Sequence, residues 1–180
     1  YTITNLAAEA AQLTPFVQLK RDSSPAPVAS DAGMGMQPFL GSALTQPDQR
    51  FTKFDFEDMA EDPFRADLTG GWIAMLQHYF VSAWVPDPDN TYRFRTRQTR
   101  SGDNIIGYTG PAMVIASGET TTISNQLYVG PKNQSVLADL ATHLDLVVDY
   151  GWLWWIAQPL FWLLTMIQSV VVNWGVAIIF

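Results

Sequence analysis

The last thirty residues, 151–180, contain no Asp, Glu, Lys or Arg, and they hold five of the seven tryptophans of the chain. An apolar run of about 20 residues can cross a bilayer as a helix, because a helix satisfies its own backbone hydrogen bonds. Trp152, Trp154 and Trp155 crowd one end of the run, as aromatic side chains do at the level of the lipid headgroups. The run therefore predicts a membrane-associated chain.

Two arrangements of this run are open. Hydropathy alone predicts that 152–172 spans the bilayer, but Gln158, Thr165 and Ser169 form a thin polar stripe at helical spacing, and Pro159 interrupts the run. A helix that lies in the membrane surface uses such a stripe. We expect an amphipathic interfacial helix over 151–172 and the start of a transmembrane helix over 173–180. The expected membrane-interface side chains are Trp152, Trp154, Trp155, Phe161, Trp162 and Trp174.

The charge of the chain argues against a nucleic-acid partner. The net charge is -7 and the pI is about 4.5, whereas a phosphate-backbone binder needs clustered Lys and Arg. All ten Lys and Arg lie at or before Lys132, and the only Asp, Glu, Lys or Arg residues between Lys132 and the apolar run are acidic. Under the positive-inside rule this pattern places 1–150 outside the cytoplasm. The absence of cysteine fits an oxidising compartment.

The first 150 residues predict antiparallel β-sheets packed as a sandwich, with helices at the C-terminal end. Short apolar runs follow one another at hairpin spacing, with Gly and Pro between them, whereas 22–38 predicts a long loop. We expect 1–6 and 13–21 to be neighbouring strands, 72–85 to be one central strand with two apolar faces, and 132–144 to be an amphipathic helix. The other expected strands are 39–45, 51–56, 91–99, 104–109, 112–116 and 120–129.

No catalytic, cofactor or metal residue is expected, so the chain is not predicted to be an enzyme. The 87–98 segment starts like a calcium loop but has Tyr92 and Gln98 where that loop needs Gly and Glu. His143 has no second His or Cys at metal spacing, and the acids of 55–62 predict a solvated helix or turn. Trp72, His78 and Trp84 would line a cleft, although a lone strand histidine is more often a hydrogen-bonded core residue.

Four arginines mark a second candidate site. Arg93, Arg95 and Arg97 alternate along one strand and so share a face, with Arg100 just beyond. This face would meet an anionic partner or lipid headgroups. Alternatively, it belongs to an edge strand that charge protects from aggregation.

Three segments resemble the bacterial branch of the YidC/Oxa/Alb family of membrane protein insertases. They are GGWIAMLQHYFVSAWVP at 70–86, VGPK at 129–132 and HLDLVVDYGWLWWIAQPLFWLLTMIQ at 143–168, and the similarity continues through NWGVAII at 173–179. The resemblance covers essentially the whole chain. It implies a β-super-sandwich similar to mutarotase folds, of which 1–150 would be the C-terminal part, in a longer membrane protein.

The same resemblance implies a function. Members of the family act as insertases or chaperones that pass hydrophobic nascent segments into the bilayer, alone or beside the Sec translocon and its SecDF partner. It further implies a bacterial inner-membrane location with 1–150 on the periplasmic side, and the lipid bilayer and nascent membrane proteins as partners. The family's membrane groove would lie beyond Phe180. From a different class, a membrane-tethered carbohydrate- or peptide-binding sandwich stays open, whereas a mutarotase-like enzyme would need a carboxylate partner for His78.

Overall fold

The computed structural model describes residues 1–24, 39–46, 49–148 and 154–179, and it divides the chain into two compact units. Unit 1 is Tyr1–Val147 and unit 2 is Val148–Phe180. The expected loop 22–38 lies mostly outside the described residues. The boundary between the units falls close to residue 150, where the sequence changes from mixed to wholly apolar.

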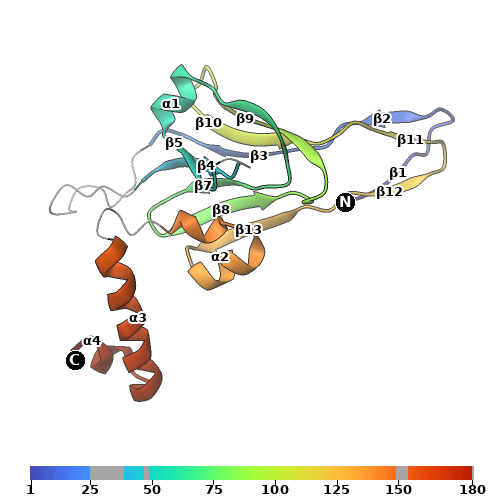
Figure 1. Cartoon of the computed structure of the whole chain (residues 1–180). Coiled ribbons are helices and arrows are strands. Elements are labelled where there is room, and N and C mark those ends of the chain that lie inside the picture. The colour runs from blue at the N-terminus through green and yellow to red at the C-terminus, as the bar shows by residue number, and fades with distance from the viewer. Residues whose placement is uncertain (25–38, 47–48, 149–153, 180) are drawn as a thin grey trace. The chain divides into compact units, whose positions relative to one another are not determined.

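Unit 1 is a sandwich of two antiparallel sheets, as the sequence predicted (Figure 1). The four-stranded sheet has the order β3 (Phe16–Arg21), β10 (Asn104–Thr109), β9 (Thr91–Gln98) and β6 (Arg65–Thr69). The five-stranded sheet has the order β13 (Gln126–Pro131), β8 (Phe80–Val85), β7 (Ile73–Leu76), β4 (Gly41–Leu44) and β5 (Thr52–Phe54). The expected hairpin between 39–45 and 51–56 is confirmed as the β4–β5 pair.

The core fills the space between the two sheets. Side chains that alternate along β9 and β10 point into it, where they meet residues of β4 and β7. Tyr108 packs against Tyr92 with ring centroids 5.0 Å apart and against Phe94 at 5.4 Å. The cluster consists of Leu44, Ile73, Met75, Tyr92, Phe94, Ile106 and Tyr108. Alternate residues of β9 consequently face solvent on the outer side of the four-stranded sheet.

The run 72–85 is not one strand. It forms the hairpin β7–β8, in which Gln77 N–H donates to the carbonyl of Phe80 at 3.0 Å and residues 77–79 make the turn. The prediction of a single strand was wrong because Gln77, His78 and Tyr79 interrupt the run without Gly, Pro, Asn or Asp to announce a turn. The two apolar faces are confirmed, since Ile73–Leu76 are all buried.

Two further strand predictions were wrong. The run 120–129 divides into β12 (Thr120–Thr122) and β13, and the segments 1–6 and 13–21 are not paired with each other. Instead, β1 (Thr2–Thr4) pairs with β12, β2 (Ala11–Leu13) pairs with β11 (Met113–Ile115), and β3 joins β10. Figure 1 shows the two ribbons β1–β12 and β2–β11 extending from the right of the sandwich. Long-range pairing of this kind leaves no local pattern in the sequence.

Among the residues of unit 1 that the structure describes there are three short helices. Helix α1 (Phe56–Glu61) begins with a capping box, in which the Asp55 carboxylate accepts from Asp58 N–H at 2.7 Å. Helix α2 (Gln134–Leu140) and the 3₁₀ helix η1 (Leu144–Val147) replace the longer helix expected over 132–144. They are separated at Ala141, whose backbone is extended, and at His143, which has a φ of 67°. Leu137, Leu144 and Val147 are buried there.

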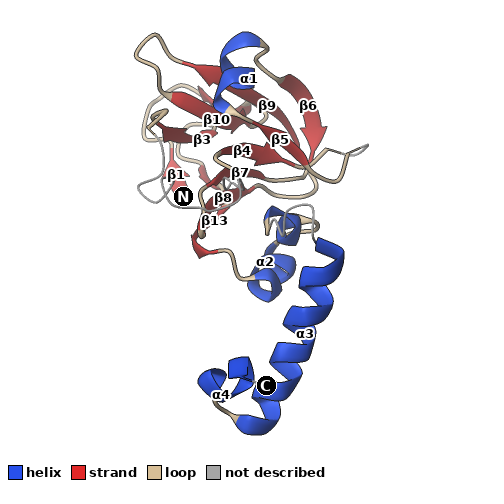
Figure 2. Cartoon of the chain, turned by 90° about the vertical axis from the view of Figure 1, so that its left-hand side faces the viewer, coloured by secondary structure: helices blue, strands red, loops and turns tan. Residues whose placement is uncertain are grey.

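The described part of unit 2 forms two helices, α3 (Trp154–Val171) and α4 (Trp174–Ile179) (Figure 2). Helix α3 has Pro159 in its interior. Between the helices, Val172 has a φ of 56°, and the Asn173 side chain accepts from the N–H groups of Gly175 at 2.9 Å and Val176 at 3.3 Å. Asn173 therefore caps α4. Among the described residues, no helix has the length and hydropathy needed to cross a bilayer.

Candidate functional site

The surface of α3 is largely apolar. Its exposed side chains include Trp162, which is 67% exposed, and Val170, which is 78% exposed, together with Leu160, Phe161, Leu163 and Met166. The hydroxyl of Thr165 donates to the carbonyl of Phe161 at 2.6 Å, and that of Ser169 donates to the carbonyl of Met166 at 2.7 Å. These two polar side chains are satisfied within the helix. An exposed apolar surface of this kind marks a membrane or a protein partner.

The expected membrane-interface residues are only partly described. Phe161 and Trp162 lie exposed on α3, and Trp174 at the start of α4 is half exposed. Trp152 lies outside the described residues, and the side chains of Trp154 and Trp155 do as well, although the backbone of both is helical. Their role at a membrane stays a prediction.

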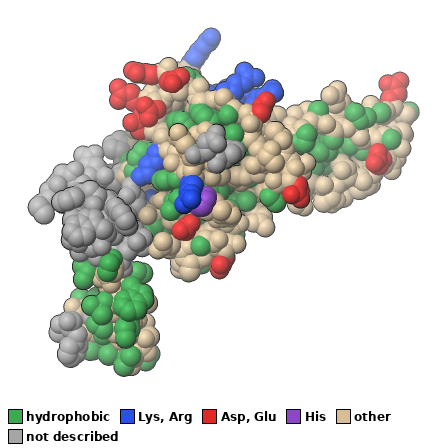
Figure 3. Space-filling view, viewed as in Figure 1, with side chains coloured by type: hydrophobic (Ala, Val, Ile, Leu, Met, Phe, Trp, Pro, Cys, Tyr) green, Lys and Arg blue, Asp and Glu red, His purple; other side chains and the backbone are tan. Residues whose placement is uncertain are grey.

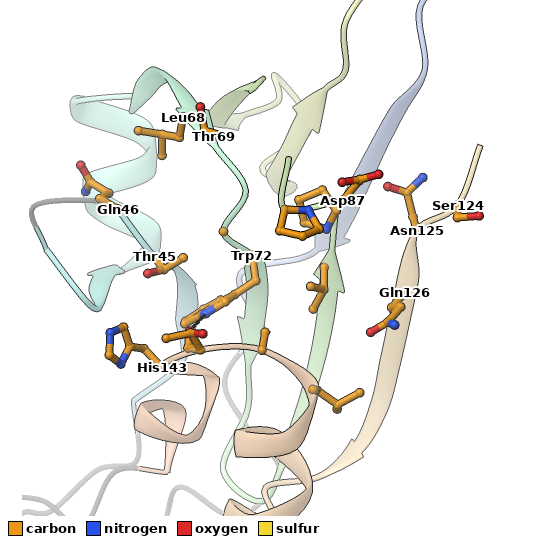
Figure 4. A pocket seen from close by; sticks show the side chains of 17 residues that line it. Thr45, Gln46, Leu68, Thr69, Trp72, Asp87, Ser124, Asn125, Gln126 and His143 are labelled. Carbon is orange, nitrogen blue, oxygen red and sulfur yellow. Dashed lines mark hydrogen bonds between the residues drawn. The ribbon is translucent and has the colours of Figure 1, made fainter. Parts of the chain in front are cut away.

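A pocket of about 750 Å³ opens on unit 1, beside the five-stranded sheet (Figure 4). Asp87 and Asn125 lie next to each other at one end of it, while Thr45 and His143 lie at the other. Tyr108 O–H donates to the Asn125 side-chain oxygen at 2.8 Å and so fixes the orientation of this amide. Burial raises the pKa of Tyr108, so the hydroxyl keeps its proton. The pocket offers hydrogen bonds and one carboxylate.

Trp72, His78 and Trp84 do not share this pocket or any single cleft. Trp84 is paired with Ile73 and packs against the core between the sheets, whereas Trp72, one residue before Ile73, lies on the opposite side of the sheet. The Trp72 side chain is completely buried and forms part of the pocket wall, and its Nε1–H donates to the carbonyl of Thr142 at 3.0 Å. His78 lies in the β7–β8 turn, with its ring 3.9 Å from that of Tyr79.

The predicted shared face of Arg93, Arg95 and Arg97 is confirmed. All three are exposed on β9, while Tyr92, Phe94 and Thr96 are buried. Arg100 is exposed in the turn after β9. The edge-strand explanation was wrong, because β9 lies between β10 and β6.

The pairing register adds residues that the sequence did not single out. Arg65 of β6 lies directly opposite Arg95, and Asp67 lies opposite Arg93. We call Arg65, Arg93, Arg95 and Arg97 the arginine face. Figure 3 shows Lys and Arg side chains gathered at the top of unit 1, beside the acidic side chains around α1. The position of Arg65 on the arginine face follows only from the β6–β9 pairing, which no local sequence pattern encodes.

One ion pair is built into the arginine face. The Arg93 guanidinium donates to both Asp67 carboxylate oxygens, from Nε at 2.8 Å and from the terminal nitrogen at 3.2 Å. This hydrogen bonding, with the charges of Arg93 and Arg65, lowers the pKa of Asp67. Asp67 therefore keeps its negative charge to a lower pH than an unpaired carboxylate does. Within the described ranges no group of three or more His, Cys, Asp or Glu residues is placed to hold a metal ion.

The family model of the YidC periplasmic domain matches residues 1–163. The chain belongs to this family. The resemblance seen in the sequence is confirmed. The family model covers the sandwich and the first half of α3.

Curated relatives of the family align with nearly the whole chain. A membrane protein insertase YidC of Marinomonas sp. (strain MWYL1) is 49% identical over 178 residues, which are 99% of this chain and 32% of that protein. Proteins of the same name from Mannheimia succiniciproducens and Aeromonas salmonicida are each 44% identical and cover 99% of this chain, at 32% and 33% of their own lengths. The chain thus spans about a third of these relatives.

Proposed function

We propose that this chain serves as the periplasmic and membrane-surface part of a membrane protein insertase or chaperone in the bacterial inner membrane. The observation that carries the proposal is the exposed apolar surface of α3, in a chain whose relatives are named membrane protein insertases. The partners are the lipid bilayer and nascent membrane proteins. Insertion requires no covalent chemistry, because the task is to lower the desolvation cost of polar groups that cross hydrocarbon.

In this proposal α3 lies along the membrane surface. Its exposed apolar side chains, Trp162 among them, and Trp174 of α4 enter the boundary between headgroups and acyl chains. Unit 1 stands on the periplasmic side, and α4 begins the membrane-spanning part. The resemblance further supports an association with the Sec translocon and SecDF.

An exchange experiment tests the function. The matched third of the Marinomonas insertase is replaced by this chain, and the chimera is expressed in cells depleted of their own insertase. We expect restored growth and restored insertion of a reporter membrane protein, because the chain aligns over 99% of its length. A chimera that accumulates to the normal level but inserts nothing would contradict the proposal. The unmodified insertase and an empty vector are the controls.

The pocket beside the five-stranded sheet supports a second candidate, a membrane-tethered module that binds carbohydrate or peptide. Asp87, Asn125 and Gln126 supply the polar groups that either ligand would need. Calorimetric titration of the detergent-solubilised chain with oligosaccharides and with unfolded peptides tests this function. For a true site we expect the heat to disappear in Asn125→Ala. The absence of heat with every ligand eliminates this candidate and leaves the insertase proposal untouched.

A further inference from the structure

The outer side of the four-stranded sheet carries an unusual share of the positive charge of the chain. Lys20 of β3 and Arg97 of β9 are both paired with Ile105 of β10, so they lie in one cross-strand row. Arg95 and Arg65 form the next outward-facing row, two residues away along β9. With Arg93, these side chains are five of the ten Lys and Arg in a chain that has seventeen acidic residues and a net charge of -7. The positive potential is therefore concentrated on one side of unit 1.

Two of the five cations are neutralised and three are not. Arg93 is paired with Asp67, and Lys20 lies 2.9 Å from the Asp103 carboxylate. Across the described part of the chain, Arg65, Arg95 and Arg97 form no ion pair with an acidic residue. All three are exposed, so their guanidinium groups are open to an external anion.

The strand register places two of these unpaired charges against each other. Arg65 and Arg95 are direct cross-strand partners, and like charges at such positions repel. On the other side of Arg95 lies Gly107, which has no side chain to contact the guanidinium. An anion bound between Arg65 and Arg95 would turn this repulsion into attraction and could form bidentate hydrogen bonds with either guanidinium.

The spacing of the arginines fits an extended polypeptide. Outward side chains at positions i and i+2 of a strand repeat every 6.4–6.8 Å or so, and alternate side chains of an extended ligand have the same repeat. Carboxylates two positions apart in a bound segment would therefore lie over Arg95 and Arg97, with Arg65 beside Arg95 on the neighbouring strand. Phe16, which is 64% exposed, lies in the same cross-strand row as Arg93 and adds an apolar contact at one border.

The fold of unit 1 favours a protein over the lipid surface. Unit 1 ends at Val147 in the helical layer of α2 and η1, and this layer is attached to the five-stranded sheet through the Trp72–Thr142 hydrogen bond. The arginine face belongs to the other sheet and looks outward from it. The end of unit 1 at Val147 thus lies on the side of the sandwich opposite to the side that carries the arginines.

We propose that the arginine face docks an acidic segment of a partner protein, bound in an extended conformation with carboxylates at alternate positions. Arg65, Arg95 and Arg97 bind the carboxylates, and the Arg93–Asp67 pair keeps the adjoining row in place. Since exposed charges are screened by salt, the affinity falls as ionic strength rises.

A pair of peptides of equal composition tests the proposal. The probes are a labelled peptide of five Thr-Glu repeats and a peptide with five Thr followed by five Glu, measured by fluorescence anisotropy with the full chain in detergent at low salt. We expect the alternating peptide to bind more tightly than the block peptide. Arg95→Thr should weaken its binding about tenfold, the value of one charge-assisted hydrogen bond, and Arg65→Thr/Arg95→Thr should weaken it further.

A charge-matched variant controls for the loss of net charge. Arg50 is exposed in the connection between β4 and β5, and Arg50→Thr removes one positive charge away from the arginine face. This variant should change the affinity less than about twofold. Equal binding of the two peptides, or equal losses in Arg50→Thr and Arg95→Thr, overturns the proposal. So does binding to phosphatidylglycerol vesicles, sensitive to Arg95→Thr, without binding to the alternating peptide. Circular dichroism confirms that each variant is folded.

Discussion

Replacing Trp72 by alanine is expected to destabilise unit 1 by about 3–5 kcal/mol, the cost of truncating a large buried aromatic side chain. Trp72 is completely buried, its ring lies 6.1 Å from that of Phe51, and its Nε1–H donates to the carbonyl of Thr142. The substitution removes the side chain that joins the five-stranded sheet to the segment between α2 and η1. Because domains are stable by only about 5–15 kcal/mol, such a loss is a large part of the total.

Urea denaturation of the chain in detergent, followed by far-ultraviolet circular dichroism, measures this effect. Trp72→Phe keeps an aromatic ring but loses the hydrogen bond, so we expect an intermediate loss of about 1–3 kcal/mol. Trp162→Ala is the matched control, because Trp162 is 67% exposed and lies in unit 2. If Trp72→Ala shifts the transition no more than Trp162→Ala does, Trp72 is not a structural anchor and a ligand-binding role returns to consideration.

The sequence predicted much of unit 1, because hairpins leave a local pattern of apolar runs and turn residues. The β4–β5, β9 and β10 predictions depend on such patterns, and all three are confirmed. The strand predictions were wrong where the sequence carries no local turn signal or where the paired strands are far apart in the chain. His78 and Tyr79 gave no turn signal between β7 and β8, and the pairing of β1 with β12 joins residues more than a hundred positions apart. Register over such distances is set by packing and not by neighbouring residues.

The candidate sites were predictable to different degrees. The shared face of Arg93, Arg95 and Arg97 follows from period two along a single strand and is confirmed. The position of Arg65 opposite Arg95 required the β6–β9 register, which is a tertiary property. The aromatic cleft failed to form because Trp72 and Trp84 lie on opposite sides of one sheet, and a hairpin inside the run changes which residues share a side.

Replacing α3 by a flexible linker is expected to abolish insertion by the chimera. The residues Trp154–Val171 are exchanged for an 18-residue Gly-Ser sequence. The helix is about 27 Å long, and a flexible linker of this length spans about 21–25 Å on average, so the reach of the connection is preserved. What is lost is the apolar surface of Leu160, Trp162, Met166 and Val170, each worth about 1.5–3 kcal/mol when buried in an apolar medium.

The linker variant tests whether α3 anchors the chain at the membrane surface or only connects unit 1 to α4. A control keeps the helix and exchanges Leu160 with Val170, which preserves composition and the polar positions Thr165 and Ser169, so insertion should persist. The chain has no cysteine, so Trp162→Cys accepts a single spin label, which we expect to lie about 5–10 Å into the boundary between headgroups and acyl chains. A label at the bilayer centre shows that α3 does not lie at the surface. If the linker chimera inserts its reporter normally, α3 does not couple unit 1 to the membrane, because length alone then suffices.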